Sequence, residues 1–215
     1  MGNNRKGALV MTDGSVQFWD RMAERYAARP IKDTAAYEAM LADAAARLSP
    51  TDRVLEIGAG TGGAAIKLGA GVAEWRATDA SAEMVRIARA KQAPPTVSFV
   101  VADADQAFAG APYDAICAFL ILHLVADMDA TLAAIHRHLK PGGLLISKTY
   151  CVGDMNFALR HLLIPVLRVV GFVPPLKMIT SQQLHTRIAK AGFSIEASRT
   201  FGSNQHAHYI VARRL

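Results

Sequence analysis

Cysteine is scarce in this chain, whose 215 residues include two, Cys117 and Cys151. Both lie within apolar runs, and their arrangement resembles neither a disulfide framework nor a pair of metal ligands. This scarcity favours a reducing compartment, so we expect a cytoplasmic protein. The histidines show no metal-ligand spacing with carboxylates. His206 and His208 would share one face of a strand, but nothing else in the sequence supports a site there. We therefore expect no bound metal.

A long uninterrupted apolar run is also lacking. Residues 1–14 contain the charged pair Arg5-Lys6, but the apolar stretch behind it is too short for the core of a signal peptide, so we expect a loose leader. Residues 157–179 are long enough to cross a bilayer, yet arginine, histidine and proline interrupt them. A spanning helix carries few or no charges, which excludes that interpretation.

Charged residues make up only 20% of the chain, against 52% hydrophobic residues. Such a composition is too apolar for a disordered protein and sufficient for a large core. The sequence contains no linker, repeat or low-complexity segment, so residues 15–215 are expected to form one domain. The net charge of +6 favours anionic neighbours without specifying one.

The first part of this domain, residues 15–50, has a helical pattern. Phe18, Met22 and Tyr26 recur at every fourth position, and an Ala-rich helix is expected over residues 35–48. These helices would form a cap in front of the rest of the domain.

From there, short apolar runs alternate with amphipathic ones. Strands separated by helices in this way pair in parallel and are covered on both faces. The expected strands are 54–57, 74–78, 97–101, 113–119 and 144–149, and the expected helices are 64–68, 82–91 and 127–139.

The C-terminal part has a different pattern. A helix over 181–191 leads into strands 193–201 and 208–213, whose short polar connection requires an antiparallel pair. The sequence therefore predicts an α/β, Rossmann-like doubly wound sheet of seven mostly parallel strands, with an antiparallel C-terminal strand and helices on both faces. The apolar residues 154–179 form an insert that we interpret as a lid.

A glycine-rich loop, GAGTGG (58–63), stands between the first expected strand and its helix. Glycines let the backbone turn sharply and approach a ligand, and the following helix N-terminus offers free N–H groups. Together with Asp79 after the second strand, the loop matches the dinucleotide fingerprint G-x-G-x-x-G, which alone favours a nicotinamide-dependent oxidoreductase. Glu56 argues against this, because a carboxylate there repels a pyrophosphate and suits a cation such as S-adenosylmethionine.

Five segments carry a family resemblance in the same order along the chain: VLEIGAGTG (54–62), ATDAS (77–81), VVADAD (100–105), YDAICAFLILHLV (113–125) and LKPGGLLISKT (139–149). Together they resemble the motifs of class I S-adenosylmethionine-dependent methyltransferases. The segment FWDRMAERYAARP is similar to the small-molecule enzymes of ubiquinone and menaquinone biosynthesis and to bacterial phospholipid N-methyltransferases. The fourth motif lacks the Pro-Pro pair of nucleic-acid amino methyltransferases, so we expect no nucleic-acid partner.

The resemblance implies S-adenosyl-L-methionine as cofactor and assigns residues to its methionine part. Gly58, Ala59, Gly60 and Gly62 would contact this part through the backbone, with Glu56 near its ammonium group.

For the nucleoside part, the resemblance implies ribose contacts from Asp79, with Ala80 beside it. Met84 would lie against adenine, Asp103 would accept from its amino group, and Ala104 would give a backbone contact. Asp105, the second acid of the VVADAD motif, is the alternative to Asp103 for this contact. A cap, core or surface role is the structural alternative for each side chain.

At the sulfur, the resemblance implies contacts from Phe119 and Leu120, while Tyr26 would close over the cofactor. His123 is our candidate for a base or substrate contact, since histidine titrates near neutral pH; core packing is its alternative.

The reaction expected from this resemblance is in-line methyl transfer to a small, hydrophobic acceptor, quinone-like or lipid. The basic, apolar residues 154–179 would allow a transient contact with a membrane surface. We expect a monomer or a homodimer. A non-catalytic S-adenosylmethionine-binding domain is the remaining alternative.

Overall fold

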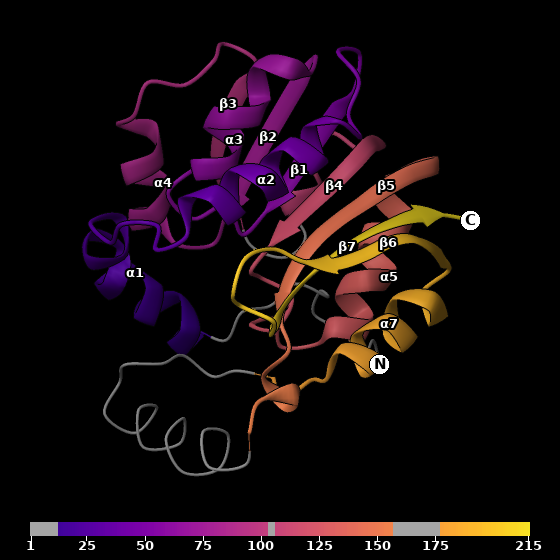
Figure 1. Ribbon diagram of the computed structural model, residues 1–215. Coiled ribbons are helices and arrows are strands. Elements are labelled where there is room, and N and C mark those ends of the chain that lie inside the picture. The colour runs from indigo at the N-terminus through magenta and orange to yellow at the C-terminus, as the bar shows by residue number, and fades with distance from the viewer. Residues whose placement is uncertain (1–12, 103–105, 157–176) are drawn as a thin grey trace, which may run out of the picture.

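The computed structural model describes residues 13–102, 106–156 and 177–215. Seven strands form one sheet in the order β3-β2-β1-β4-β5-β7-β6 (Figure 1). The strands from β1 to β5 pair in parallel, while β7 is antiparallel to both of its neighbours. The expected fold class is thus confirmed. The bounds are β1 Arg53–Ile57, β2 Glu74–Asp79, β3 Val97–Val101, β4 Tyr113–Phe119, β5 Leu139–Tyr150, β6 Phe193–Thr200 and β7 Ala207–Arg214.

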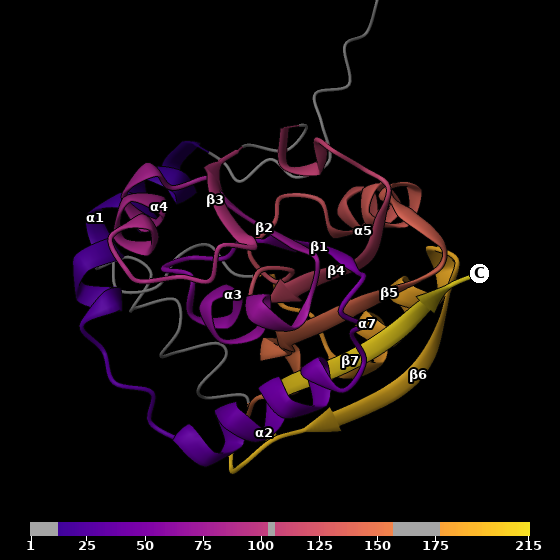
Figure 2. The same cartoon turned by 90° about the horizontal axis from the view of Figure 1, so that it is seen from above.

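Helices cover both faces of the sheet because both faces carry buried apolar side chains (Figure 2). Helices α2 (Thr34–Ala45) and α3 (Gly63–Leu68) pack on one face, and α5 (Met128–His138) and α7 (Ser181–Lys190) on the other. The alternation is plain in β1, where Val54 belongs to the α2–α3 side and Leu55 to the α5–α7 side. The short 3₁₀ turns are η1 Gly69–Gly71, η2 Gln106–Phe108 and η3 Val152–Asp154.

Helix α1 (Asp13–Ala27) packs against α4 (Ala82–Arg89) rather than directly on the sheet. Ala23 and Trp19 form a small apolar cluster with Met84 and Ile87. A polar contact joins the same two helices, since Asp20 Oδ1 accepts a hydrogen bond from Ser81 Oγ at 2.6 Å. Ser81 in turn caps α4 by accepting from the backbone N–H of Met84.

Several expected boundaries differ by one to five residues. Helix α1 begins at Asp13, so residues 13 and 14 belong to it and not to a leader. Strand β5 begins at Leu139 instead of 144, because residues 139–143 still follow the sheet as an irregular extension. The register shifts opposite Tyr113, and Gly142 has a φ of +74°.

Two further expectations concern residues that lie outside the described part of the chain. These are residues 1–12 of the expected leader and most of the expected lid over 154–179. Among the helices that the structure describes, none has the length and apolar character needed to cross a membrane.

Candidate functional site

A cavity of about 360 Å³ opens at the carboxyl ends of the parallel strands, beside α1. In an open α/β sheet this is the edge where ligands bind, because the loops that follow the strands diverge there. Eight residues that the sequence predicted for a cofactor or substrate line it: Tyr26, Gly58, Gly60, Asp79, Met84, Phe119, Leu120 and His123.

Three of the four loop glycines, Gly58, Gly60 and Gly62, have positive φ, but their surroundings differ. A Cβ on Gly58 would come within 2.6 Å of Ile121, so this glycine permits the loop after β4 to approach. A Cβ on Gly62 would collide with the Phe99 ring, so this glycine permits α3 to pack. Around Gly60 the nearest atom is in the Tyr26 ring, at 3.9 Å. Gly60 is thus the glycine that leaves open space for a ligand.

Asp79 is the acid of this cavity. Its Oδ2 accepts a hydrogen bond from the Gly60 N–H at 2.8 Å, and its Oδ1 accepts from the Ser81 N–H at 2.9 Å. Burial raises the pKa of the Asp79 carboxyl, while these two N–H donors oppose the rise. The acceptor capacity that remains on both oxygens suits a pair of ligand hydroxyls.

Glu56 lies elsewhere than expected. It is 2% exposed, does not line the cavity, and its Oε2 accepts a hydrogen bond from Trp75 Nε1 at 3.0 Å. Alternation along β1 turns its side chain to the α2–α3 face of the sheet. Burial raises the pKa of Glu56 to about 8, with the Trp75 bond opposing, so the carboxyl is largely protonated at neutral pH. Such a group offers little charge to an ammonium ion.

The remaining predicted cofactor residues also lie outside the cavity lining or outside the described residues. Ala59, Gly62 and Ala80 are not among the lining residues. Ala59 instead donates its N–H to the carbonyl oxygen of Thr78 at 2.9 Å, which ties the loop to β2. Asp103 and Ala104 lie outside the described residues.

Leu120 stands in a strained conformation at the end of β4. Its φ is +58°, a region that side-chain-bearing residues seldom occupy. A hydrogen bond of 2.7 Å from its N–H to the Lys148 carbonyl oxygen holds it there. Strain of this kind, on the order of 1–3 kcal/mol, persists where surrounding structure imposes it, and it is common at functional sites. The strained turn brings Phe119, Leu120 and Ile121 to the cavity.

His123 is buried at the cavity wall, with 5% of its surface exposed. Burial lowers the pKa of its imidazole to about 4, so the ring is neutral at neutral pH. Its Nδ1 has no hydrogen-bond partner among the described residues. The Tyr150 ring meets it edge-on, with centroids 5.6 Å apart. The sequence-based reason for choosing His123, titration near neutral pH, therefore does not hold, and its Nδ1 is buried away from the cavity. A neutral imidazole still has one ring nitrogen that can accept a proton.

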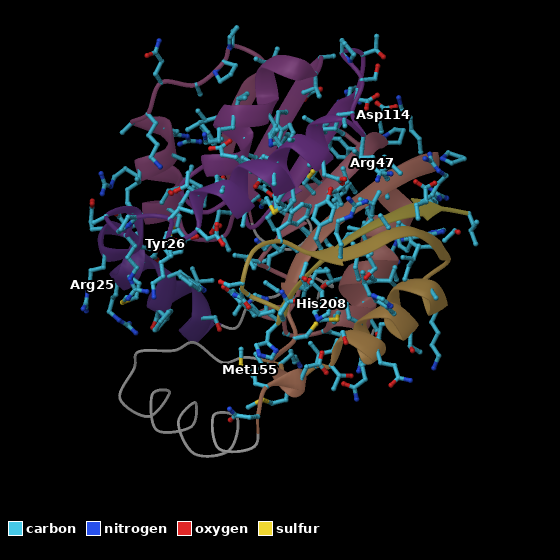
Figure 3. The ribbon with its side chains drawn as sticks, viewed as in Figure 1. Arg25, Tyr26, Arg47, Asp114, Met155 and His208 are labelled. Atoms are coloured by element: carbon cyan, nitrogen blue, oxygen red, sulfur yellow. The ribbon has the colours of Figure 1, made fainter. Side chains whose placement is uncertain are left out.

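Tyr26 and Trp19 project from α1 to close one side of the cavity. Their rings meet edge-on at 5.9 Å. Figure 3 labels Tyr26 together with its exposed neighbour Arg25 on this helix. The bonds from α4 to Asp20 hold the helix in this position.

Six lining residues were not predicted: Trp19, Ile121, Leu124, Tyr150, Val152 and Met155. The positions of two were accessible to reasoning from the sequence. Tyr150 directly follows the expected fifth strand, at the edge where the other strands present their site residues, and Trp19 neighbours the Phe18–Tyr26 pattern. Val152 and Met155 depend on the course of the chain after β5, which no motif specifies.

The chemistry of the lining is mostly apolar, with one carboxylate. None of the described residues that line the cavity is a lysine or an arginine. A pyrophosphate would therefore meet a carboxylate and no countercharge. A ligand with a ribose, a flat base and a cationic centre fits better, because Asp79 can accept from hydroxyls while Met84 and Phe119 offer apolar surface.

Comparison with known proteins agrees with this geometry. A family model described as a methyltransferase domain matches residues 21–198. The chain belongs to this family and is a class I S-adenosylmethionine-dependent methyltransferase. Its cofactor is S-adenosyl-L-methionine. The open alternatives of an oxidoreductase and of a non-catalytic domain are thereby set aside.

Two curated relatives are synthases much longer than this chain. The chain is 37% identical over 122 residues to the hybrid PKS-NRPS synthetase mpsA of Macrophomina phaseolina, covering 52% of this chain and 3% of that protein. It is 32% identical over 166 residues to the highly reducing polyketide synthase NEC1 of Pyricularia oryzae, covering 68% and 6%. The chain thus spans a small fraction of these relatives.

Solved structures share the fold. An S-adenosylmethionine-dependent methyltransferase from Mesorhizobium loti has a TM-score of 0.68 at 21% identity, covering 85% of this chain and 99% of that one. Magnesium protoporphyrin IX methyltransferase from Synechocystis, solved with bound SAH, has a TM-score of 0.64 at 19% identity, covering 94% and 95%.

Proposed function

We propose that this methyltransferase acts on a small, hydrophobic acceptor, quinone-like or lipid. The observation that carries the proposal is the apolar part of the cavity next to His123. Ile121, Leu124, Val152 and Met155 line the same cavity as Leu120 and His123. An acceptor of several rings or a chain would be desolvated by these side chains, whereas a strongly charged one would lose hydration without compensation.

For the cofactor, we propose the sites that the cavity leaves accessible. Asp79 accepts from the ribose hydroxyls, Gly60 gives the methionine part its backbone approach, and Met84 packs against the base. Phe119 and Leu120 flank the reacting centre. When bound, S-adenosylmethionine supplies a methyl group on a positively charged sulfur, which is intrinsically reactive.

The chain's own contribution is alignment and exclusion of water. Holding two reactants in line contributes roughly 7–11 kcal/mol to lowering a barrier. In our proposal the edge of α1, with Trp19 and Tyr26, shields one side of the cofactor. The strained turn at Leu120 sets the direction from which the acceptor approaches.

His123 is our proposed base. An O–H or N–H acceptor would lose its proton as its bond to the methyl carbon forms and the sulfur–methyl bond breaks, and the neutral imidazole would take that proton. His123→Ala is then expected to lower kcat by about 10²-fold or more. Leu124→Ala is the comparison for lost packing alone, because it removes a neighbouring lining side chain without a titratable group, so its effect is expected on KM and not on kcat. A kcat for His123→Ala within about twofold of wild type would remove the residue from catalysis.

The relatives favour a second acceptor class. Two of them are synthases with polyketide in their names or abbreviations, so a polyketide-like acyl chain belongs among the acceptors to be tested. It shares the apolar character that the cavity demands.

The test is transfer of a labelled methyl group from S-adenosylmethionine to a panel of phenolic quinone precursors, phospholipid vesicles and polyketide-like thioesters. Hydrophilic amines and short RNA serve as negative controls, since we propose a small-molecule acceptor and no nucleic acid. Product from an apolar member is expected. Product solely from the hydrophilic controls would overturn the proposed acceptor class.

Two proposals on partners can be measured on the same protein. We propose a transient contact with anionic membrane surfaces, tested by co-sedimentation with anionic vesicles at low salt. Sedimentation velocity distinguishes the monomer from the homodimer.

A further inference from the structure

Three side chains of different chemistry meet where β5 ends and β7 begins. They are Cys151, Asp154 and His208, and each offers a ligand atom within 4.8 Å of the other two. We propose that this cluster binds a zinc ion. The inference is independent of the acceptor and departs from the sequence-based expectation of no metal.

The fold brings these residues together through one pair of antiparallel strands. Thr149 in β5 lies opposite His208 in β7, and the Cys151 N–H donates to the carbonyl oxygen of His206 at 2.8 Å. The 3₁₀ turn η3 then folds back, with the Asp154 N–H donating to the carbonyl oxygen of Cys151 at 3.0 Å. This turn returns the carboxylate to the imidazole on the neighbouring strand.

The donor set matches the preferences of zinc. Zn²⁺ is bound in proteins by three kinds of side-chain group, namely thiolates, imidazoles and carboxylates, with bonds of roughly 2.0–2.3 Å. In a tetrahedral site such bonds hold ligand atoms roughly 3.3–3.8 Å apart. His208 Nε2 already lies 3.9 Å from Asp154 Oδ2. Closing the remaining gap requires a shift on the order of 1 Å or less in side chains.

The fourth position falls to water. His206 lies in the turn before β7, and its ring nitrogens are not among the ligand atoms that lie within 4.8 Å of one another. Zinc sites with three protein ligands keep the fourth position for a water molecule. We therefore assign that position to water.

Zinc binding must replace the thiol proton. Burial raises the pKa of the Cys151 thiol to about 12, with the Asp154 charge adding to the rise. The Zn–S bond forms as the S–H bond breaks, and the proton leaves to solvent, so binding is expected to release a proton.

The consequence for the protein is a fixed cavity wall. Asp154 Oδ2 already accepts a hydrogen bond of 2.8 Å from the Ser181 N–H at the start of α7. Tyr150, Val152 and Met155 alternate with the proposed ligands and line the cavity. Figure 3 labels Met155 and His208 in the same region of the molecule. A metal at this point would hold the acceptor side of the cavity to the sheet.

The test is titration of the purified full chain with Co²⁺ and then Zn²⁺. Wild type is expected to bind one equivalent of Co²⁺ with visible bands of a tetrahedral ion and a near-ultraviolet thiolate-to-cobalt band, which Zn²⁺ abolishes. Cys151→Ser should lose the thiolate band, and Cys151→Ser and His208→Gln should each weaken Zn²⁺ binding at least about tenfold. Cys117→Ala, which removes the other buried thiol, should bind as wild type does.

Thermal unfolding with and without Zn²⁺ keeps the test independent of activity. A zinc-dependent rise in Tm is expected for wild type and Cys117→Ala and not for Cys151→Ser. Circular dichroism of each variant without metal shows whether it has folded. No Zn²⁺ binding to folded wild type at micromolar concentration, or equal binding by folded Cys151→Ser and His208→Gln, would overturn the proposal.

Discussion

The carboxylate of Asp79 accepts a hydrogen bond of 2.8 Å from the backbone N–H of Gly60. The acid at the end of β2 therefore positions the glycine loop after β1 as well as facing the cavity. Since one carboxylate serves both the loop and the proposed ribose contact, its loss should affect cofactor binding twice over.

We expect Asp79→Asn to weaken binding of S-adenosylhomocysteine by roughly 10- to 150-fold. Hydrogen bonds to a charged group contribute about 1.5–3 kcal/mol, and an amide can serve only one of the two N–H donors. Isothermal titration calorimetry measures the change. Glu38→Gln removes an exposed carboxylate paired with Lys67 and should leave the affinity unchanged. Equal affinity in Asp79→Asn and wild type would contradict the assigned role.

Gly62→Ala is expected to destabilise the protein by about 2–5 kcal/mol. The positive φ of +80° costs a side-chain-bearing residue about 1–2 kcal/mol, and the new methyl group would lie 2.6 Å from the Phe99 ring. Urea unfolding measures the loss. Gly71→Ala is the matched control, because no atom lies within 4 Å of the added carbon. Similar losses in the two variants would refute the packing argument.

Glu56→Gln should change how stability depends on pH. Because burial raises the folded pKa of Glu56 to about 8, the folded state binds more protons than the unfolded one between pH 4.5 and about 8, and stability falls as the pH rises through that window. The amide removes this slope and still accepts from Trp75. Urea unfolding at about pH 5.5 and about pH 8.5 should show the variant gaining on wild type at the higher pH. Parallel pH profiles would count against a raised pKa.

Asp20→Ala should loosen α1. Asp20 Oδ1 accepts from Ser81 Oγ at 2.6 Å and from the Glu83 N–H at 3.3 Å, and removing a partly buried acceptor costs about 1–3 kcal/mol. Hydrogen exchange of the α1 amides should accelerate. Glu24→Ala breaks an exposed ion pair with Arg86 between the same helices and should have little effect. If both variants exchange alike, the Asp20 contact does not hold the helix.

Sequence patterns predicted the elements that obey a simple period. The bounds of β3 and β4 are those expected, because each is a continuous apolar run between polar loops. The beginning of β5 was not, since Lys140-Pro141-Gly142-Gly143 reads as a turn although the chain there still follows the sheet. The local sequence of residues 140–143 does not show that this segment runs beside β4 in the sheet.

At the site, the sequence predicted which residues follow the strands and so reach the cavity. It did not predict to which face of the sheet a side chain within a strand points. Asp79 and Phe119 line the cavity as strand-end residues do. Glu56 sits within β1, where both faces of the strand are buried, so composition does not distinguish the face toward the cavity from the face toward Trp75. The Cys151–His208 neighbourhood depends on strand register across a long sequence separation, which the sequence alone does not specify.

The position of β7 between β5 and β6 has a consequence for synthesis of the chain. On the ribosome β6 emerges before β7, yet it has no partner in the sheet until β7 arrives to join it to β5. The nascent chain therefore leaves one edge of β5 unpaired until residues 207–214 have left the exit tunnel. A fragment ending before residue 207 would lack β7, which is an interior strand of the sheet. Without β7, strand β6 would have no partner in the sheet.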